Sequence, residues 1–265
     1  MKNEHRQLSL SVGAGAMITA LFLACGGGDR PEDAPAAETT TPAPEAPAAP
    51  PEPLGSARIA GTVVYQGAVP NLPALRMDAD PQCAAKHTEP VLSPELVLGS
   101  GQSLGNVFVR VKWPGDQPLP APAEPVVFDQ QGCMYHPHVV GVQVGQTFKI
   151  KNSDGLLHNV HSFSEQNPPF NRAMPASVTE VDQSFANEEF MFRVKCDVHP
   201  WMNAFVTVSE HPFYAVTGAD GTYEIAGLPA GTYELEAWHE RLGTQTATVT
   251  VADGESATQA FTFTR

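Results

Sequence analysis

The stretch EFMFRVKCDVHPWMNAFVTV, residues 189–208, combines a β-strand pattern with a run of metal-binding side chains. Apolar and polar residues alternate up to Cys196, which predicts a half-buried strand. The inward face of this strand would hold Phe190, Phe192, Val194 and Cys196. His199 and Met202 follow at three-residue spacing before AFVTV resumes the sheet. A single tight turn can therefore present Cys196, His199 and Met202 to one point.

A second histidine is offered upstream by NSDGLLHNVHS, residues 152–162. If HNVH is extended, a period of two places His158 with Val160 on one face and His161 on the other. We therefore expect His158 to point inward and His161 to face water.

One thiolate, two imidazoles and a thioether form a soft donor set, typical of a nearly trigonal copper site with a weak axial ligand. Zinc fits less well, because a thioether is a poor zinc donor and structural zinc prefers further thiolates or imidazoles. The competing interpretation is a buried cysteine that lies near a histidine by chance. The Cys, His, Met spacing together with the upstream HNVH disfavours it.

The N-terminal stretch has the layout of a secretory signal peptide, with Lys2 and Arg6 ahead of an apolar run that ends in small residues. LFLAC resembles a bacterial lipobox, in which Cys25 becomes the lipidated first residue of the mature chain. The alternative is an ordinary signal or a membrane anchor with a chance cysteine. We expect residues 1–24 to be removed and the Pro, Ala and Glu rich residues 25–55 to form a disordered tether.

This leader predicts an exported protein, held on a bacterial membrane by lipid and facing the periplasm or the cell exterior. Gly26, which follows the cysteine, is compatible with sorting to the outer membrane in a cell that has two membranes.

The chain has four cysteines, Cys25, Cys83, Cys133 and Cys196. If Cys25 carries lipid, three remain in an oxidising compartment, and the simplest arrangement pairs Cys83 with Cys133 and protects Cys196 with a metal. Pairing Cys196 with either of the others would remove the metal thiolate, and stays open. A second metal site also stays open; its ligands would be Cys83, His87, Cys133 and His136.

From about residue 57 the chain alternates apolar with polar residues between Gly, Pro, Asp and Asn turns, and no long helical period competes. Many short strands at this spacing predict an all-β fold built from antiparallel sandwiches.

The chain is acidic, with a formal charge of −14. Without residues 1–24, 13 basic and 28 acidic side chains remain, a charge of −15. No basic stripe could neutralise phosphates, which excludes nucleic acid as a partner. No haem-attachment motif, Ser nucleophile elbow, P-loop or clustered carboxylate pair that would argue for hydrolysis occurs, so we expect neither enzymatic activity nor a small-molecule substrate.

The two metal-ligand stretches together resemble those of the amicyanin-like cupredoxins. CDVHPWM is similar to their loop of Cys, two residues, His-Pro, an aromatic residue and Met, and NSDGLLHNVHS is similar to their upstream ligand loop. The resemblance implies a Greek-key β-sandwich over residues 119–210 with one type 1 copper. Its ligands would be His158, Cys196, His199 and Met202.

In that family the Asn after the first histidine, here Asn159, ties the two ligand loops together. The resemblance also implies that His199 reaches the surface through an apolar patch, to which Pro200 and Trp201 would contribute. Leu157 departs from the family, since amicyanins have proline before this histidine.

The C-terminal segment resembles a carboxypeptidase regulatory-like, transthyretin-like domain, with a turn at Asp220-Gly221, then GLPAG, then alternating aromatic and aliphatic residues. This implies a second, smaller antiparallel sandwich over residues 211–265. RIAGTVVYQG, residues 58–67, resembles the first strand of that family. We therefore expect residues 57–115, within an N-terminal β segment spanning 56–118, to join residues 212–265 in one discontinuous sandwich. Three sequential units are the alternative.

Taken together, these patterns predict a lipid-anchored blue copper protein that carries single electrons between redox proteins such as a c-type cytochrome or a respiratory complex. Copper capture or delivery at the cell surface is one alternative. A non-redox adhesion or scaffold role is the other.

Overall fold

The computed structural model of the chain describes residues 53–115 and 118–265. Within these ranges the regular structure is almost entirely β-strand, which confirms the all-β prediction. The strands form four sheets that enclose two separate apolar cores. No helix in the described residues combines the length and the apolar character that a bilayer crossing needs. The predicted signal peptide, Cys25 and the tether as far as residue 52 lie outside the described residues.

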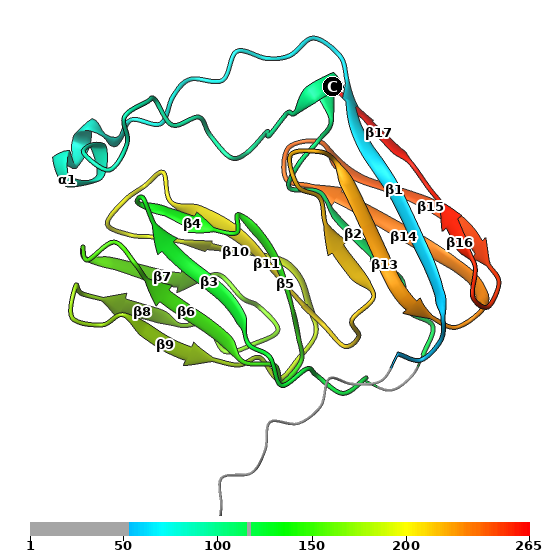
Figure 1. Cartoon of the computed structure of the whole chain (residues 1–265). Helices are drawn as coiled ribbons and strands as arrows, with labels where there is room; N and C mark the ends of the chain where they lie inside the picture. Colours follow the sequence, from blue (N-terminus) through cyan, green and yellow to red (C-terminus); the bar gives the residue numbers. More distant parts are fainter. Residues whose placement is uncertain (1–52, 116–117) are drawn as a thin grey trace, which may run out of the picture. The chain divides into compact units, whose positions relative to one another are not determined.

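Strands from both ends of the described chain build the first sandwich, which we call the split sandwich (Figure 1). One sheet contains β1 (Ala57–Gln66), β13 (Thr222–Leu228), β16 (Ser256–Thr258) and β17 (Phe261–Thr264). The other contains β12 (Tyr214–Val216), β2 (Phe108–Val111), β14 (Gly231–His239) and β15 (Gly243–Val251).

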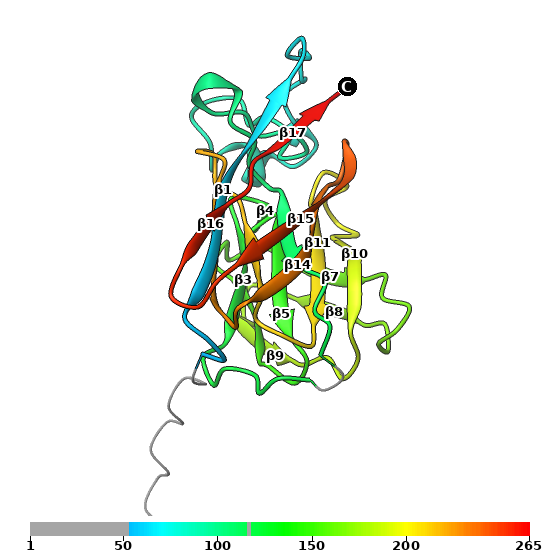
Figure 2. The ribbon, with the colours of Figure 1, turned by 90° about the vertical axis from the view of Figure 1, so that its right-hand side faces the viewer.

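Strand β1 joins the two halves of the split sandwich. It pairs antiparallel with β13 and parallel with β16 and β17, which lie beside it in Figures 1 and 2. The sandwich is therefore discontinuous, and mixed rather than purely antiparallel. Gly61 allows the close approach of the C-terminal segment, because a Cβ at this position would lie 1.7 Å from the carbonyl oxygen of Gln259.

The second sandwich, which we call the inserted sandwich, lies between β2 and β12 in the sequence. One sheet contains, in spatial order, β5 (Val139–Gln143), β11 (Asn203–Ser209), β10 (Glu189–Lys195), β7 (His158–Ser162) and β8 (Asn171–Met174). The other contains β4 (Met134–His136), β3 (Val126–Gln131), β6 (Phe148–Asn152) and β9 (Glu180–Gln183). Period-two alternation buries Phe128, Ile150 and Val206 in the core between them.

The alternation of β10 fails at its first residues. Phe192, Val194 and Cys196 are buried as predicted, but Phe190 is not aligned with them. A bulge between Glu189 and Phe192, with Met191 at a φ of 53°, shifts the register. The prediction for Phe190 is therefore wrong; its ring instead lies under the guanidinium of Arg110, 3.7 Å from the ring centroid.

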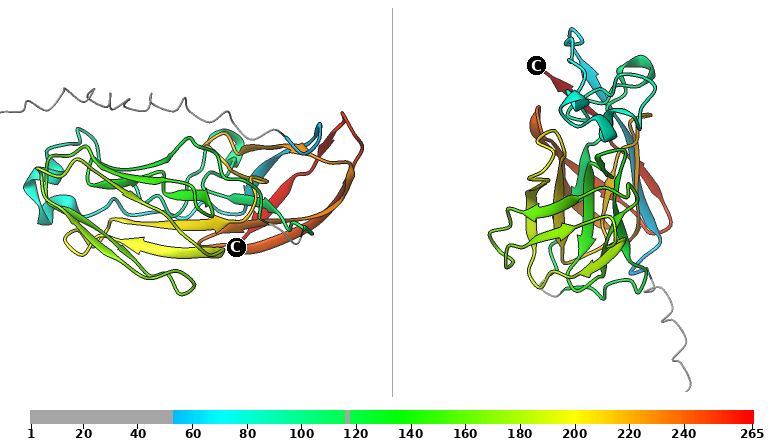
Figure 3. Two further views of the ribbon diagram at one scale, coloured as in Figure 1. Left: turned by 90° about the horizontal axis from the view of Figure 1, so that it is seen from below. Right: turned by 90° about the vertical axis from the view of Figure 1, so that its left-hand side faces the viewer.

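Residues 67–107 contain much less β-structure than the predicted N-terminal β segment implies. They include the 3-10 helices η1 (Met77–Ala79) and η2 (Ser100–Gln102) and the short helix α1 (Pro81–Ala84). We call residues 77–87 the cap segment. Its Met77 and Cys83 belong to the core of the inserted sandwich, and the views of Figures 1 and 3 both show α1 beside that sandwich, far from β17. Cys83 forms a disulfide with Cys133, between β3 and β4, as predicted.

Two buried histidines lie in the part of the chain that leads into and builds the split sandwich. Burial lowers the pKa of His211 and of His239 to about 4. The Nδ1 atom of His211 accepts the backbone N–H of Phe213 at 3.1 Å, and that of His239 accepts the N–H of Arg241 at 3.2 Å. Both imidazoles are therefore held neutral near pH 7.

The metal-free protein is expected to lose stability in mild acid because of these two histidines. The unfolded chain protonates them near pH 6.5, whereas the folded chain does not until about pH 4, so the unfolding free energy rises with pH across this window. From pH 7 to pH 5 each should remove about 2 kcal/mol. Urea unfolding of the wild type and of a His211→Asn, His239→Asn variant, which keeps both acceptors, measures this; an equal pH slope in the two proteins would contradict it.

Candidate metal centre

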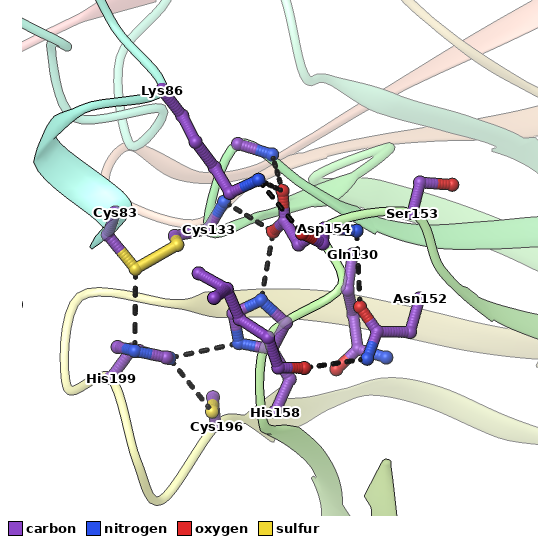
Figure 4. A network of polar contacts seen from close by, with 12 residues as sticks. Cys83, Lys86, Gln130, Cys133, Asn152, Ser153, Asp154, His158, Cys196 and His199 are labelled. Carbon is purple, nitrogen blue, oxygen red and sulfur yellow. Dashed lines mark hydrogen bonds and ion pairs between the residues drawn. A yellow bond between two sulfur atoms is a disulfide. The ribbon is translucent and has the colours of Figure 1, made fainter. Parts of the chain in front are cut away.

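Three of the predicted ligands meet in the core of the inserted sandwich (Figure 4). The Nδ1 atoms of His158 and His199 lie 2.9 Å apart, and Nδ1 of His199 lies 3.7 Å from Sγ of Cys196. These three residues are buried, and each can direct one ligand atom to within 4.8 Å of the others. Met202 is also fully buried and belongs to the same core.

Backbone hydrogen bonds fold the loop after β10 around this point. The Cys196 N–H donates to the Met202 carbonyl at 3.0 Å, and the Met202 N–H donates to the His199 carbonyl at 2.9 Å. Asn203 then pairs with Lys195, so β10 and β11 leave the loop as neighbours. The three-residue spacing thus becomes a closed loop whose ends are fixed by the sheet.

The upstream histidine stands at the first position of β7. His158 and Val160 are buried, whereas the ring of His161 is on the other face, with Nδ1 3.0 Å from an oxygen of Asp197. This is the orientation that the alternation of HNVH predicts.

Asn159 links the two ligand loops. Its Oδ1 accepts the backbone N–H of Asp197 at 2.7 Å and lies 3.3 Å from Sγ of Cys196, which donates to it when protonated. Its Nδ2 donates to a carboxylate oxygen of Asp197 at 3.0 Å. These contacts fix the residue that follows Cys196 and hold a dipole beside the sulfur, the role that the resemblance assigns to this Asn.

Carboxylates hold the outward nitrogens of both ligand imidazoles. Nε2 of His158 lies 2.8 Å from Oδ2 of Asp154, and Nε2 of His199 lies 3.1 Å from Oδ2 of Asp80. A carboxylate that is ionised can only accept, so each Nε2 must carry the hydrogen. Each Nδ1 then has a lone pair directed into the site, unless a proton occupies it.

The charges of these groups are strongly coupled. Burial lowers the pKa of His158, but the hydrogen bonds with Asp154 and Cys196 outweigh it and raise the pKa to about 9. Burial raises the pKa of Cys196, but the hydrogen bond with His158 and nearby backbone N–H groups lower it to about 7. The metal-free site therefore favours a thiolate next to an imidazolium, and a cation can replace the proton they share.

His199 does not reach the surface as the resemblance implies. It is only 2% exposed, because the cap segment covers it: Asp80 contacts Nε2, and Sγ of Cys83 lies 3.4 Å from the same nitrogen. Trp201 is half-buried and donates from Nε1 to the carbonyl of Cys133 at 3.0 Å, whereas Pro200 is exposed. The disulfide-linked cap segment thus covers the histidine that was expected to be exposed.

The structure does not assemble the second metal site that the sequence left open. Cys83 and Cys133 are joined to each other, His87 directs Nε2 to the carbonyl of Gly132 at 2.7 Å, and His136 is exposed. Cys196 is the unpaired cysteine among the described residues.

The donor set fits copper. Two imidazole Nδ1 atoms and one thiolate of lowered pKa point to a common centre, and a thioether is buried in the same core. Lone pairs facing each other at 2.9 Å need a proton or a cation between them. A soft, singly negative set of this kind suits copper better than zinc or a hard cation.

Sequence reasoning missed Asp80 and Asp154. Asp154 stands four residues before His158 in NSDGLLH, which was the available signal for it. Asp80 is far from the ligand motifs in the sequence, and only the cap segment brings it to His199. Two exposed apolar residues beside the ligands, Leu157 and Val198, were also missed as surface features; they are 51% and 45% exposed.

A family model covers the C-terminal part of the chain. Residues 197–264 match the carboxypeptidase regulatory-like domain. The match takes in β11 of the inserted sandwich together with β12–β17, while β1 and β2 of the split sandwich lie outside it. The regulatory-like match therefore covers only part of the sandwich that the structure shows. No curated protein matches the chain significantly.

Part of this chain is similar to solved structures of copper proteins. A variant of amicyanin in its Cu(I) form is 21% identical, with a TM-score of 0.29, over 38% of this chain and 98% of its own. A purple cupredoxin from Nitrosopumilus maritimus is 23% identical, with a TM-score of 0.27, over 32% and 99%. A Cu-containing nitrite reductase from Thermus scotoductus SA-01 is 22% identical, with a TM-score of 0.30, over 36% of this chain but only 26% of the reductase. At these identities the likeness concerns the fold alone.

Proposed function

We propose that this chain is an exported, lipid-anchored protein that binds one type 1 copper and passes single electrons between redox proteins outside the cytoplasm. The observation that carries the proposal is the pair of Nδ1 atoms facing each other at 2.9 Å beside the Cys196 sulfur, with Met202 buried in the same core. The ligands are His158, Cys196, His199 and Met202.

Copper bound by these donors would supply a one-electron couple. The protein's part is to keep the donors in place. Sheet pairing fixes both ends of the 196–202 loop, and Asn159 ties this loop to His158 through Asp197. Donors held in this way move little when the charge of the centre changes, which favours fast electron exchange.

The partner is expected to be a basic or locally positive redox protein, such as a c-type cytochrome or a respiratory complex. The mature charge of −15 would attract it, with an association rate that falls as salt increases. Leu157, Val198 and Pro200 are exposed near the ligands and offer apolar contact area. In this scheme Cys25 carries the lipid and residues 26–55 give the folded part its reach.

Copper delivery is less well supported by this site. The described ligands are buried, and the cap segment covers His199, so an acceptor has no direct access to a ligand. Delivery would predict ready loss of copper to an apo-acceptor, whereas electron transfer predicts redox cycling with the copper retained. A scaffold role would predict that Cys196→Ser leaves the function unchanged. We expect no enzymatic turnover.

The copper-loaded protein is expected to show an intense thiolate-to-copper band in the visible spectrum and the matching electron paramagnetic resonance signal of a type 1 centre. Cys196→Ser should abolish the band, because the thiolate is the donor of that transition. His161→Asn, which changes a neighbouring histidine on the opposite face of β7, should keep it. A copper-loaded wild type without the band would refute the type 1 assignment.

A further inference from the structure

The geometry points to Asp80 and Asp154 as positioning residues: each holds one ligand imidazole through Nε2, and together they favour the oxidised copper. This inference rests on the proposed copper site. It adds that carboxylates of this chain set the tautomer, the ring orientation and part of the redox balance. His199 is then covered by the charged cap segment and is not exposed at the surface.

Asp154 is itself immobilised. Its side chain is only 2% exposed. Oδ1 accepts the backbone N–H of Gly132 at 2.7 Å and pairs with Nζ of Lys86 at 3.2 Å; Oδ2 accepts the N–H of Cys133 at 2.7 Å and meets Nε2 of His158 at 2.8 Å. With both oxygens engaged, the carboxylate cannot turn away from His158, so the imidazole is fixed in the plane that this hydrogen bond requires.

Asp80 is held by different means. Oδ1 caps the start of α1, accepting from the N–H groups of Gln82 at 2.8 Å and Cys83 at 3.4 Å, which leaves Oδ2 for Nε2 of His199. The disulfide from Cys83 to Cys133 joins α1 to the loop between β3 and β4. The backbone thus sets the position of a partly exposed carboxylate on a buried imidazole.

Two effects follow for the centre. Because each Nε2 donates its hydrogen, each Nδ1 is left free for the metal, and neither ring can rotate without breaking a charge-assisted hydrogen bond. A carboxylate behind an imidazole also makes it a stronger donor, and its negative charge stabilises Cu(II) more than Cu(I). Removing either carboxylate should therefore raise the reduction potential.

The test compares Asp80→Asn with Asp78→Asn in copper-loaded protein. Asn at position 80 can still cap α1 but removes the charge at His199. Asp78 lies two residues away, is exposed and, within the described part of the chain, forms its one ion pair with Arg76, so its substitution is the matched control for charge. We expect Asp80→Asn to weaken Cu(II) binding about tenfold relative to Cu(I), which raises the potential by about 59 mV, whereas Asp78→Asn should match the wild type.

A second readout does not need copper. In the metal-free protein the Nε2 hydrogen of His199 should give a nuclear magnetic resonance signal protected from solvent exchange, and Asp80→Asn should remove that protection. If Asp80→Asn does not fold, Asp80→Ser is used in its place, because serine also caps a helix and carries no carboxylate. Asp154→Asn should affect the His158 signal in the same way.

The outcomes separate this inference from the proposed function. Copper binding with the same potential in the position-80 and position-78 variants would overturn the inference and leave the copper site standing. A wild type that binds no copper would refute the proposed function. The protected His199 signal would still show the contact with Asp80 in that case. If this signal were absent from the wild type, the positioning role of Asp80 would be refuted as well.

Discussion

Removing the disulfide with Cys83→Ala and Cys133→Ala is expected to lower the unfolding free energy of the metal-free protein by about 4 kcal/mol. The two cysteines are 50 residues apart in the sequence, and closing a loop of that length restricts the unfolded chain by about this amount. Both positions are fully buried, so alanine is used in place of serine to avoid an unsatisfied hydroxyl. Urea unfolding followed by tryptophan fluorescence measures the loss.

The same variant has a second expected phenotype. Without the disulfide, α1 is no longer tied to Cys133, and the cap segment should open from His199 more often. A chelator should then remove copper from the variant faster than from the wild type. The control is Asp78→Asn, which changes an exposed side chain of the cap segment and keeps the disulfide. Unchanged stability together with an unchanged rate of copper loss would contradict the structural role assigned to this bond.

Met202→Leu is expected to keep the copper and raise its reduction potential. In the proposed site the Met202 thioether would be the weakest of the four donors, and an apolar group of similar volume would remove its electron donation to Cu(II) while it fills the same space. The loss of stability should stay below about 1.5 kcal/mol, since the swap conserves volume. Voltammetry of the copper-loaded variant measures the potential.

Met202→Ala is the informative comparison, because it removes the same sulfur and leaves a cavity. Met202 is fully buried in the inserted-sandwich core, so truncation should reduce the unfolding free energy of the metal-free protein by about 2–5 kcal/mol. A potential in Met202→Leu equal to that of the wild type would show that the sulfur does not contact the copper, even if Met202→Ala is destabilised.

The local sequence pattern was sufficient to predict the strand content and the ligands that the structure brings together. Alternation in residues 192–196 and in HNVH determines which side chains face the core, and a shift of one residue would reverse every one of them. The prediction failed at Phe190 because a bulge, with Met191 at positive φ, shifts the register by one residue, and the alternation of residue types does not show where such a bulge occurs.

Long-range placement could not be read in the same way. The sequence of the cap segment has no apolar periodicity from which the surface that it covers could be predicted. Its position depends on Met77 and Cys83, which are buried in a core built by residues far downstream. The burial of His199 and the contact with Asp80 follow from that packing. The resemblance to amicyanin-like proteins predicted an exposed histidine, because it rests on the two ligand loops, and residues 77–87 lie outside both.

The pairing of β1 has a consequence for the order in which this protein can be completed. Val63 meets Phe261 in the finished sheet, so this part of β1 cannot pair with β17 until the chain has been made as far as residue 261. The inserted sandwich, by contrast, has all its strands in one continuous stretch and can form first. Contacts of such high sequence separation form slowly. In the interval β1 presents an unpaired edge, and a chain cut before residue 261 would leave part of that edge permanently open to other molecules.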